Sequence, residues 1–240
     1  MREVIQPTRQ TYTTIGELVV TVLDDPSILP SDPGTHVWCP ESTAVGTCSW
    51  DLLAAVPTAA AADSVCEHLF AVVVDDAATY FVPEASLLTA NLLLAASRGG
   101  RPLADVITWV RGGQLAPAAQ LLEDVDEVGA VEDLEAFAAS SPGEQAAIWA
   151  VVRQVMLPLG TPAALKALSM RPVSGFIRGT VPQFTMAAYA VPFLVDRVVI
   201  AVAPRSPLSG VANAFRSWLL LTAARSFRPV RIVHGDSGGM

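Results

Sequence analysis

The strongest constraint on the fold is the long segment from Asp51 to Leu168, which has helical periodicity throughout and lies between β-rich segments. Its apolar residues recur three and four positions apart, as in helices with one face in a core. Leu18–Leu23 precedes it, and Arg197–Ala203 and Pro229–Val233 follow it. Short apolar runs of this kind are typical of strands buried in a parallel sheet. The order predicts an α/β fold, helix-rich overall, with a large all-α insertion in the sheet.

A helix hairpin is predicted at the centre of this segment, from Glu84 to Gly113. Ser97-Arg98-Gly99-Gly100 ends its first helix, because glycine readily takes the left-handed conformation that closes a helix. Pro102 follows where the first turn of the second helix accepts proline. Both helices lack a wide polar face and are expected to pack against other elements; their apolar residues are Leu87, Leu88, Leu92, Leu94, Ala95, Leu103, Val106, Ile107 and Val110, with Trp109 beside them.

Other segments have weaker or purely local signals. A capping box at Ser141-Pro142-Gly143-Glu144 predicts the start of a long helix that contains Ile148 and Trp149. Proline and glycine punctuate residues 30–50, which predicts a loop anchored to the core by Trp38 and Trp50. Further helices are expected over Thr58–Val74, Leu115–Val125, Val131–Ala139, Phe176–Tyr189 and Val211–Ala224.

These boundaries divide the chain into three parts. Residues 1–50 are expected to form the first part of an α/β sheet core, residues 51–172 an all-α domain, and residues 173–240 the return to the sheet core. A helical block inserted into a sheet explains this layout better than two domains in series.

The charge of the chain excludes one class of partner. Its net charge is −8 and its pI about 4.8, whereas nucleic-acid-binding surfaces are normally basic, so direct nucleic-acid binding is not expected. The mean hydropathy of +0.45 comes largely from alanine and valine. No run of about 18 uncharged apolar residues predicts a membrane span. The N-terminus MREVIQPTRQ has no signal-peptide core, and a cytoplasmic protein is expected.

The cysteines predict neither a disulfide framework nor a metal centre. Cys39, Cys48 and Cys66 are sparse and lack CxxC spacing, so reduced thiols are expected. His36 with Cys39 and Cys48 would be an incomplete zinc site, because no second ligand pair completes it. An acidic cluster, Glu123 to Glu127, is interpreted as a solvated surface.

A small-molecule enzyme is one hypothesis for the carboxyl ends of the strands. Asp24 and Asp25 follow the first β-rich run, at the sheet edge where ligands collect in open α/β proteins, and Arg205 follows the second. The simpler interpretation is that the two aspartates begin a turn. The chain has no glycine-rich phosphate loop and no nucleophile–base pair, so no catalytic, cofactor-binding or metal-binding residue is predicted.

The C-terminal sequence Gly235-Asp236-Ser237-Gly238-Gly239 matches the nucleophile signature of chymotrypsin-like proteases. In those enzymes a histidine accepts the serine proton and an aspartate orients the histidine. Only His36 and His68 accompany His234, in no matching motif, and the helical centre is unlike a double β-barrel. The signature is interpreted as a decoy, and whether the chain is an enzyme stays open, with a non-enzyme favoured.

Several short motifs occur in a fixed order along the chain. Leu23-Asp24-Asp25-Pro26 follows a strand, and Gly46-Thr47-Cys48-Ser49-Trp50 ends the proline-rich segment. Ala95 to Gly100 then leads to Asp105-Val106 and Trp109, followed by Ile148-Trp149 and by Val198–Pro204. This order, over about residues 15–225, resembles the TraG/TraD-like coupling ATPases of conjugation and type IV secretion, of the actinobacterial type. The resemblance implies a partial RecA-like parallel sheet interrupted by an all-α domain.

The chain departs from that family where the family does its chemistry. The Walker A loop, GxxxxGK[ST], is missing, and the single lysine, Lys166, lies in Ala-Leu-Lys-Ala. The segment nearest to a Walker B strand has Arg231 within it and no Glu after Asp236. The resemblance therefore implies a non-catalytic protein whose partners are a coupling ATPase, a relaxase or a secretion substrate. The alternative is a helical regulatory or interaction protein unrelated to secretion.

Overall fold

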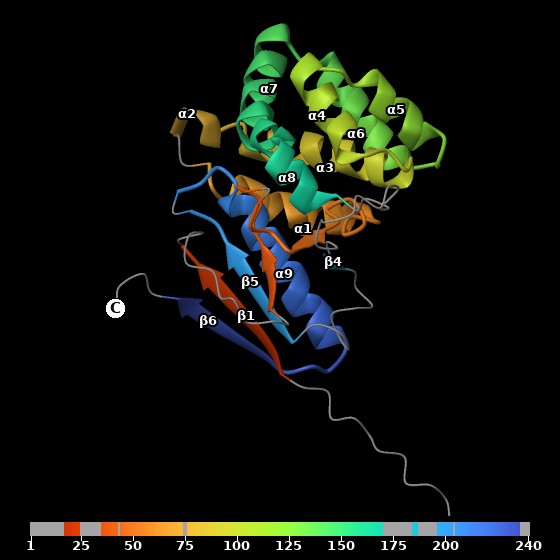
Figure 1. The fold of residues 1–240 in the computed structure, drawn as a ribbon. Coiled ribbons are helices and arrows are strands. Elements are labelled where there is room, and N and C mark those ends of the chain that lie inside the picture. Colours follow the sequence, from red (N-terminus) through yellow and green to blue (C-terminus); the bar gives the residue numbers. More distant parts are fainter. Residues whose placement is uncertain are drawn as a thin grey trace, which may run out of the picture.

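The computed structural model describes residues 17–24, 35–42, 44–73, 76–169, 184–186, 196–203 and 205–235. It is a helix-rich α/β fold, as predicted, with helices stacked beyond one end of a small sheet (Figure 1). The main sheet is parallel and has the strand order β2-β5-β1-β6. Its strands are β1 (Leu18–Leu23), β2 (Thr35–Trp38), β5 (Arg197–Ala201) and β6 (Val230–Gly235).

A block of helices lies in the chain between strand β3 (Cys48–Trp50) and strand β4 (Phe184–Met186), which pair in parallel with each other. We call it the helical block. It comprises α1 (Ala59–Phe70), α2 (Asp76–Thr79), α3 (Val82–Arg98), α4 (Leu103–Gly112), α5 (Ala116–Glu123), α6 (Val128–Ala139), α7 (Pro142–Met156), the 3-10 helix η1 (Leu157–Gly160) and α8 (Pro162–Leu168). The last helix of the described chain is α9 (Ser209–Arg225), between β5 and β6.

Two of the local predictions are wrong. Strands β2 and β3 lie inside the segment predicted as a loop, and β4 lies inside the segment predicted as a helix. The reason is the same in each case, because β2 pairs with β5 and β3 pairs with β4 across long stretches of chain. Proline and glycine punctuation reports only on local conformation, so it cannot reveal these pairings. The rest of the segment Phe176–Tyr189 lies outside the described residues.

Helix α9 covers one face of the sheet (Figure 1). Leu18 and Val20 of β1 are fully buried on that face, while the alternating residues Val19 and Thr21 point to the other face. Phe215 of α9 lies 4.8 Å from Trp38 and 5.2 Å from Trp50, measured between ring centroids. Both tryptophans have zero exposure, so their predicted anchoring role is confirmed.

Arg228 connects the amino-terminal ends of neighbouring strands in the main sheet. It precedes β6, and its buried guanidinium donates to Asp196 Oδ1 at 2.7 Å, just before β5. The same group donates to the carbonyl of Glu17, just before β1, at 3.4 Å. One buried cation thus joins the starts of three neighbouring strands, an arrangement that no local pattern in the sequence indicated.

The predicted hairpin is confirmed as α3 and α4. The chain turns between them at Gly100, whose φ of +61° is the left-handed conformation that the sequence predicted for this corner. The capping prediction for α7 also holds, because Ser141 Oγ accepts the backbone N–H of Glu144 at 3.3 Å. Helix α3 is the centre of the helical block and contacts α1, α4, α5, α6 and α7.

The helical block and the sheet meet where α9 crosses α1. Gly210, in the first turn of α9, faces the end of α1 so closely that a Cβ atom would lie 2.8 Å from the carbonyl oxygens of His68 and Leu69. These atoms are backbone and cannot rotate away. The close approach of the two helices therefore requires glycine at this position.

Among the described residues, no single helix is long and apolar enough to cross a bilayer; α7 with η1 passes such a test only together with α8, across a bend of 82°.

Substituting Gly210→Ala is expected to lower the free energy of unfolding by about 1–3 kcal/mol, because the new methyl group forces α9 away from α1. Gly129→Ala is the matched control, since a Cβ atom at Gly129 of α6 meets nothing within 4 Å. The control should raise stability by roughly 0.5–1 kcal/mol through helix propensity. Urea unfolding followed by circular dichroism measures both. Equal stability of Gly210→Ala and the wild type would contradict the close approach.

Candidate functional site

Functional side chains are expected at the carboxyl edge of the main sheet, because ligands bind at this edge in open α/β folds. Asp24 lies at the end of β1 and is exposed, and Arg205 lies in the loop after β5, exposed and with a φ of +61°. Asp25 lies outside the described residues. Among the described residues Glu41, after β2, also lies at this edge, and its Oε2 accepts the backbone N–H of Ala203 at 2.9 Å. Asp24 and Arg205 line neither of the cavities described below.

The described residues considered for nucleotide binding and for the protease signature lie in separate parts of the fold. Lys166 lies within α8, not at the end of a strand. His36 in β2 and His234 in β6 lie on opposite edges of the main sheet, with β5 and β1 between them. Asp236 and Ser237 lie outside the described residues. Burial lowers the pKa of His36, which favours its neutral form.

The three cysteines are buried and free. Burial raises the pKa of the Cys48 and Cys66 thiols strongly and that of Cys39 in the same direction. A thiol with a raised pKa is a poor nucleophile and a poor metal ligand, because both roles require the thiolate. Among the described residues, no group of three or more His, Cys, Asp or Glu side chains is placed to hold a metal ion.

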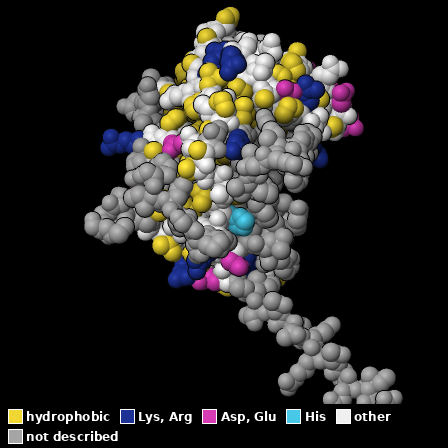
Figure 2. Space-filling view, in the orientation of Figure 1, with side chains coloured by type: hydrophobic (Ala, Val, Ile, Leu, Met, Phe, Trp, Pro, Cys, Tyr) yellow, Lys and Arg dark blue, Asp and Glu magenta, His cyan; other side chains and the backbone are white. Residues whose placement is uncertain are grey.

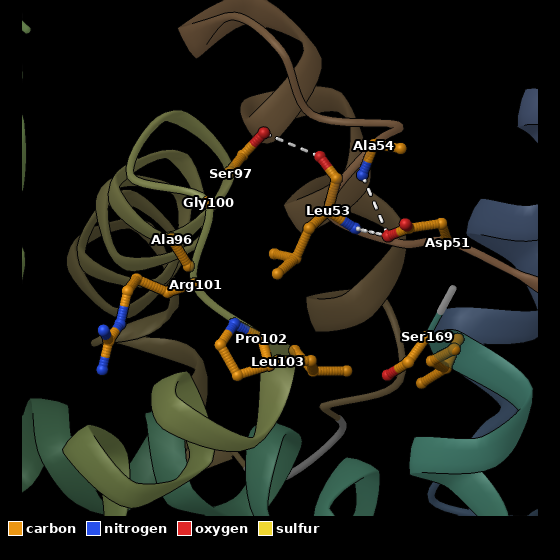
Figure 3. Close-up of a pocket in the computed structure, with 11 residues that line it drawn as sticks. Asp51, Leu53, Ala54, Ala96, Ser97, Gly100, Arg101, Pro102, Leu103 and Ser169 are labelled. Atoms are coloured by element: carbon orange, nitrogen blue, oxygen red, sulfur yellow. Dashed lines mark hydrogen bonds between the residues drawn. The ribbon is translucent and has the colours of Figure 1, made fainter. Parts of the chain in front are cut away.

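The larger cavity lies at the corner of the hairpin and has a volume of about 380 Å³ (Figure 3). We call it the corner cavity. It lies where the chain enters and leaves the helical block, since Leu52 N–H donates to the carbonyl of Leu168 at 3.2 Å. Its lining comes from the turn after β3, the corner between α3 and α4, and the end of α8: Asp51, Leu53, Ala54, Ala96, Ser97, Gly100, Arg101, Pro102, Leu103, Leu168 and Ser169.

Two polar side chains of the corner cavity, Asp51 and Ser97, hold the backbone of the turn after β3. Asp51 Oδ1 accepts the backbone N–H groups of Leu53 and Ala54, each at 3.1 Å. Ser97 Oγ donates to the carbonyl of Leu53 at 2.8 Å. Arg101 extends away from Asp51 on the opposite side of the cavity (Figure 3) and pairs with Asp105 at 2.6 Å. The corner cavity is therefore interpreted as a structural contact region between the turn after β3 and the helix hairpin, not as a ligand site.

The second cavity is a groove of about 220 Å³ between α3, α6 and α7. We call it the acidic groove. Its floor is apolar and its rim has three carboxylates, with no arginine or lysine among the lining residues. Sequence analysis missed it because its members come together only in the fold; they are Glu84, Leu87, Leu88, Asn91, Asp133, Ala136, Phe137, Ser140, Glu144 and Ile148.

No protein-family model, no curated protein and no solved structure matches this chain. In the face shown in Figure 2, hydrophobic side chains spread over the helical block, and acidic side chains lie at its margin on the side of α5 and α6. In this view the helical block thus presents hydrophobic side chains together with both acidic and basic ones.

Substituting Asp51→Ala is expected to destabilise the protein by about 0.5–2 kcal/mol, because two backbone N–H groups lose their acceptor. Asp51→Asn keeps an acceptor oxygen and should lower the stability by only roughly a few tenths of a kcal/mol. Arg101→Ala, on the other side of the corner cavity, removes an exposed ion pair and should change stability by less than about 0.5 kcal/mol. Thermal unfolding of the three variants tests the structural role. A stable Asp51→Ala variant would argue against it.

The thiols are expected to resist modification in the folded protein. Ellman's reagent at pH 8 should label less than one thiol per native chain within minutes, because all three cysteines are buried with a raised pKa. In urea all three should react at once. A single fast-reacting thiol in the native protein, located by mass spectrometry, would reopen the possibility of a catalytic or metal-binding cysteine.

Proposed function

We propose that this protein is a non-catalytic, coupling-protein-like component of a conjugation, type IV secretion or mobile-element system, and that it acts in the cytoplasm by binding other proteins. The observation that supports this most is the order of elements. The chain leaves the main sheet after β2, passes through β3, the helical block and β4, and returns through β5 to lie between β1 and β2. A partial RecA-like sheet with a large all-α insertion would have this order.

The absence of catalysis is part of the proposal. Phosphoryl transfer needs a lysine in a glycine-rich loop and a carboxylate that holds Mg²⁺ after a hydrophobic strand. Lys166 lies in a helix, and the second residue of β6 is Arg231, paired with Glu17 at 3.1 Å. The partners of the protein would be a coupling ATPase, a relaxase or a secretion substrate. Its negative net charge disfavours direct DNA binding.

The test is transfer of the mobile element in the organism that carries the protein. Deleting the gene is expected to lower the transfer frequency at least tenfold, and the wild-type gene supplied in trans should restore it. The purified coupling ATPase and relaxase of the same element should be tested separately for direct binding to the full chain by calorimetry. Binding of one of them at micromolar or tighter affinity is expected.

The purified full chain should also show no saturable ATP binding below 1 mM and no phosphate release above background, with the coupling ATPase as the positive control. Turnover by the isolated chain at rates near the ordinary enzymatic range of about 1–10³ s⁻¹ would refute the non-catalytic assignment. Unchanged transfer after deletion would instead favour a helical regulatory protein unrelated to secretion.

A further inference from the structure

We propose that the acidic groove binds an amphipathic helix of a partner protein, with leucine-like side chains on the apolar floor and arginine or lysine side chains against the carboxylate rim. This inference rests on the proposed protein-binding function and names the site and the chemistry of its ligand.

The apolar floor is formed along one stripe of α3. Glu84, Leu87, Leu88 and Asn91 follow one another at spacings of three and four residues, so they lie on one side of the helix. Leu87 is 44% exposed, in a helix whose residues Leu88 to Ala96 are all buried. Within the stripe, Glu84 and Leu87 reach solvent, whereas Leu88 and Asn91 are buried. Leu87 thus presents a large apolar side chain at the surface.

The floor is held rigidly from the neighbouring helices. Phe137 of α6 packs edge-on against Trp149 of α7, at 5.8 Å between ring centroids and an interplanar angle of 86°. Ile148, beside Trp149, is 2% exposed and closes the bottom of the groove. A preformed apolar surface of this kind loses little conformational entropy when a partner binds to it.

The rim has uncompensated negative charge. Glu84, Asp133 and Glu144 line the groove from three helices. The arginines of the helical block that form ion pairs use other carboxylates, since Arg98 pairs with Glu127 and Arg101 with Asp105. A cationic partner would therefore meet three carboxylates in a groove whose described lining contains no arginine or lysine.

Asn91 is a positioning residue for this rim. It is 5% exposed and stands in a run of leucine and alanine, where a polar side chain gains nothing from burial alone. Its Nδ2 donates to Asp133 Oδ2 at 3.3 Å, from α3 to α6. The contact holds the Asp133 carboxylate at the edge of the apolar floor.

The dimensions favour a helix over other ligands. At about 220 Å³ the groove is smaller than the roughly 300–1,000 Å³ of small-molecule sites, so it suits one or two side chains of a larger partner. It lies between helices, whose backbone groups are already paired, so it cannot add a strand by main-chain hydrogen bonds. An amphipathic helix laid in the groove needs only side-chain contacts.

The experiment uses the full chain and a fluorescein-labelled, 18-residue peptide of leucine and arginine patterned as an amphipathic helix. A scrambled peptide of the same composition and a peptide with glutamate in place of arginine are the peptide controls. Fluorescence anisotropy at 50 mM salt is expected to give micromolar affinity for the patterned peptide and at least tenfold weaker binding for both controls. Raising the salt to 300 mM should weaken binding several-fold.

Matched variants separate the groove from general charge attraction. The triple variant Glu84→Gln, Asp133→Asn, Glu144→Gln should weaken binding about tenfold or more, since three rim contacts are lost together. The control variant Glu123→Gln, Asp124→Asn, Asp126→Asn removes the same charge from exposed positions outside the groove and should stay within threefold of wild type. Leu87→Ser, at an exposed position, should weaken binding at least fivefold while circular dichroism stays unchanged.

Equal weakening by the two triple variants, equal binding of the scrambled peptide, or no effect of Leu87→Ser would each overturn the inference. The outcome is independent of the transfer test. Peptide binding in the groove with unaffected transfer would refute the conjugation assignment alone, whereas a transfer defect on deletion without groove binding would refute the groove alone.

Discussion

Helix α9 is held between the sheet and the helical block, and the rest of the structure depends on that packing. On the sheet side, Phe215 contacts the rings of Trp38 and Trp50. On the other side, Gly210 brings the first turn of α9 against the backbone of α1. A single hydrophobic cluster consequently runs from β1 through α9 into α1 and α3. Because such interiors are close-packed and transmit strain, the helices above the sheet cannot shift without opening this core.

The same rigidity extends to the surface at α3. This helix is enclosed by five neighbours, and its two buried polar side chains both have partners. Thr89 Oγ1 donates to the carbonyl of Ala85 at 2.8 Å within the helix, whereas Asn91 reaches across to Asp133. The first contact is local and stabilises nothing beyond α3. The second spans 42 residues and fixes α6 relative to α3, so a polar residue in the core has its effect at the rim of the acidic groove.

The sequence predicted those parts of the fold whose cause is local. The strand Leu18–Leu23 is a continuous β-rich run, and the corner at Gly100 and the cap at Ser141 depend on residues a few positions away. The parts of the fold that the sequence did not predict depend on contacts between segments that are far apart in the chain. Strand β2 exists because β5 lies beside it, and Arg228 joins three strand starts that are far apart in the chain. The acidic groove was missed for the same reason, because its rim comes from three helices.

The distribution of charge indicates which part of the molecule interacts with partners. Between Val82 and Met156 the sequence has ten Asp and Glu residues and four Arg residues, so this stretch holds most of the net charge of −8. At the carboxyl edge of the sheet, by contrast, Glu41 is engaged with the backbone of Ala203, and the nearby Cys39 thiol is buried. The net negative charge of these helices attracts a cationic partner over about 8 Å at physiological salt. The apolar stripe at Leu87 then selects among cationic partners, because only one with a matching apolar face gains from burying it.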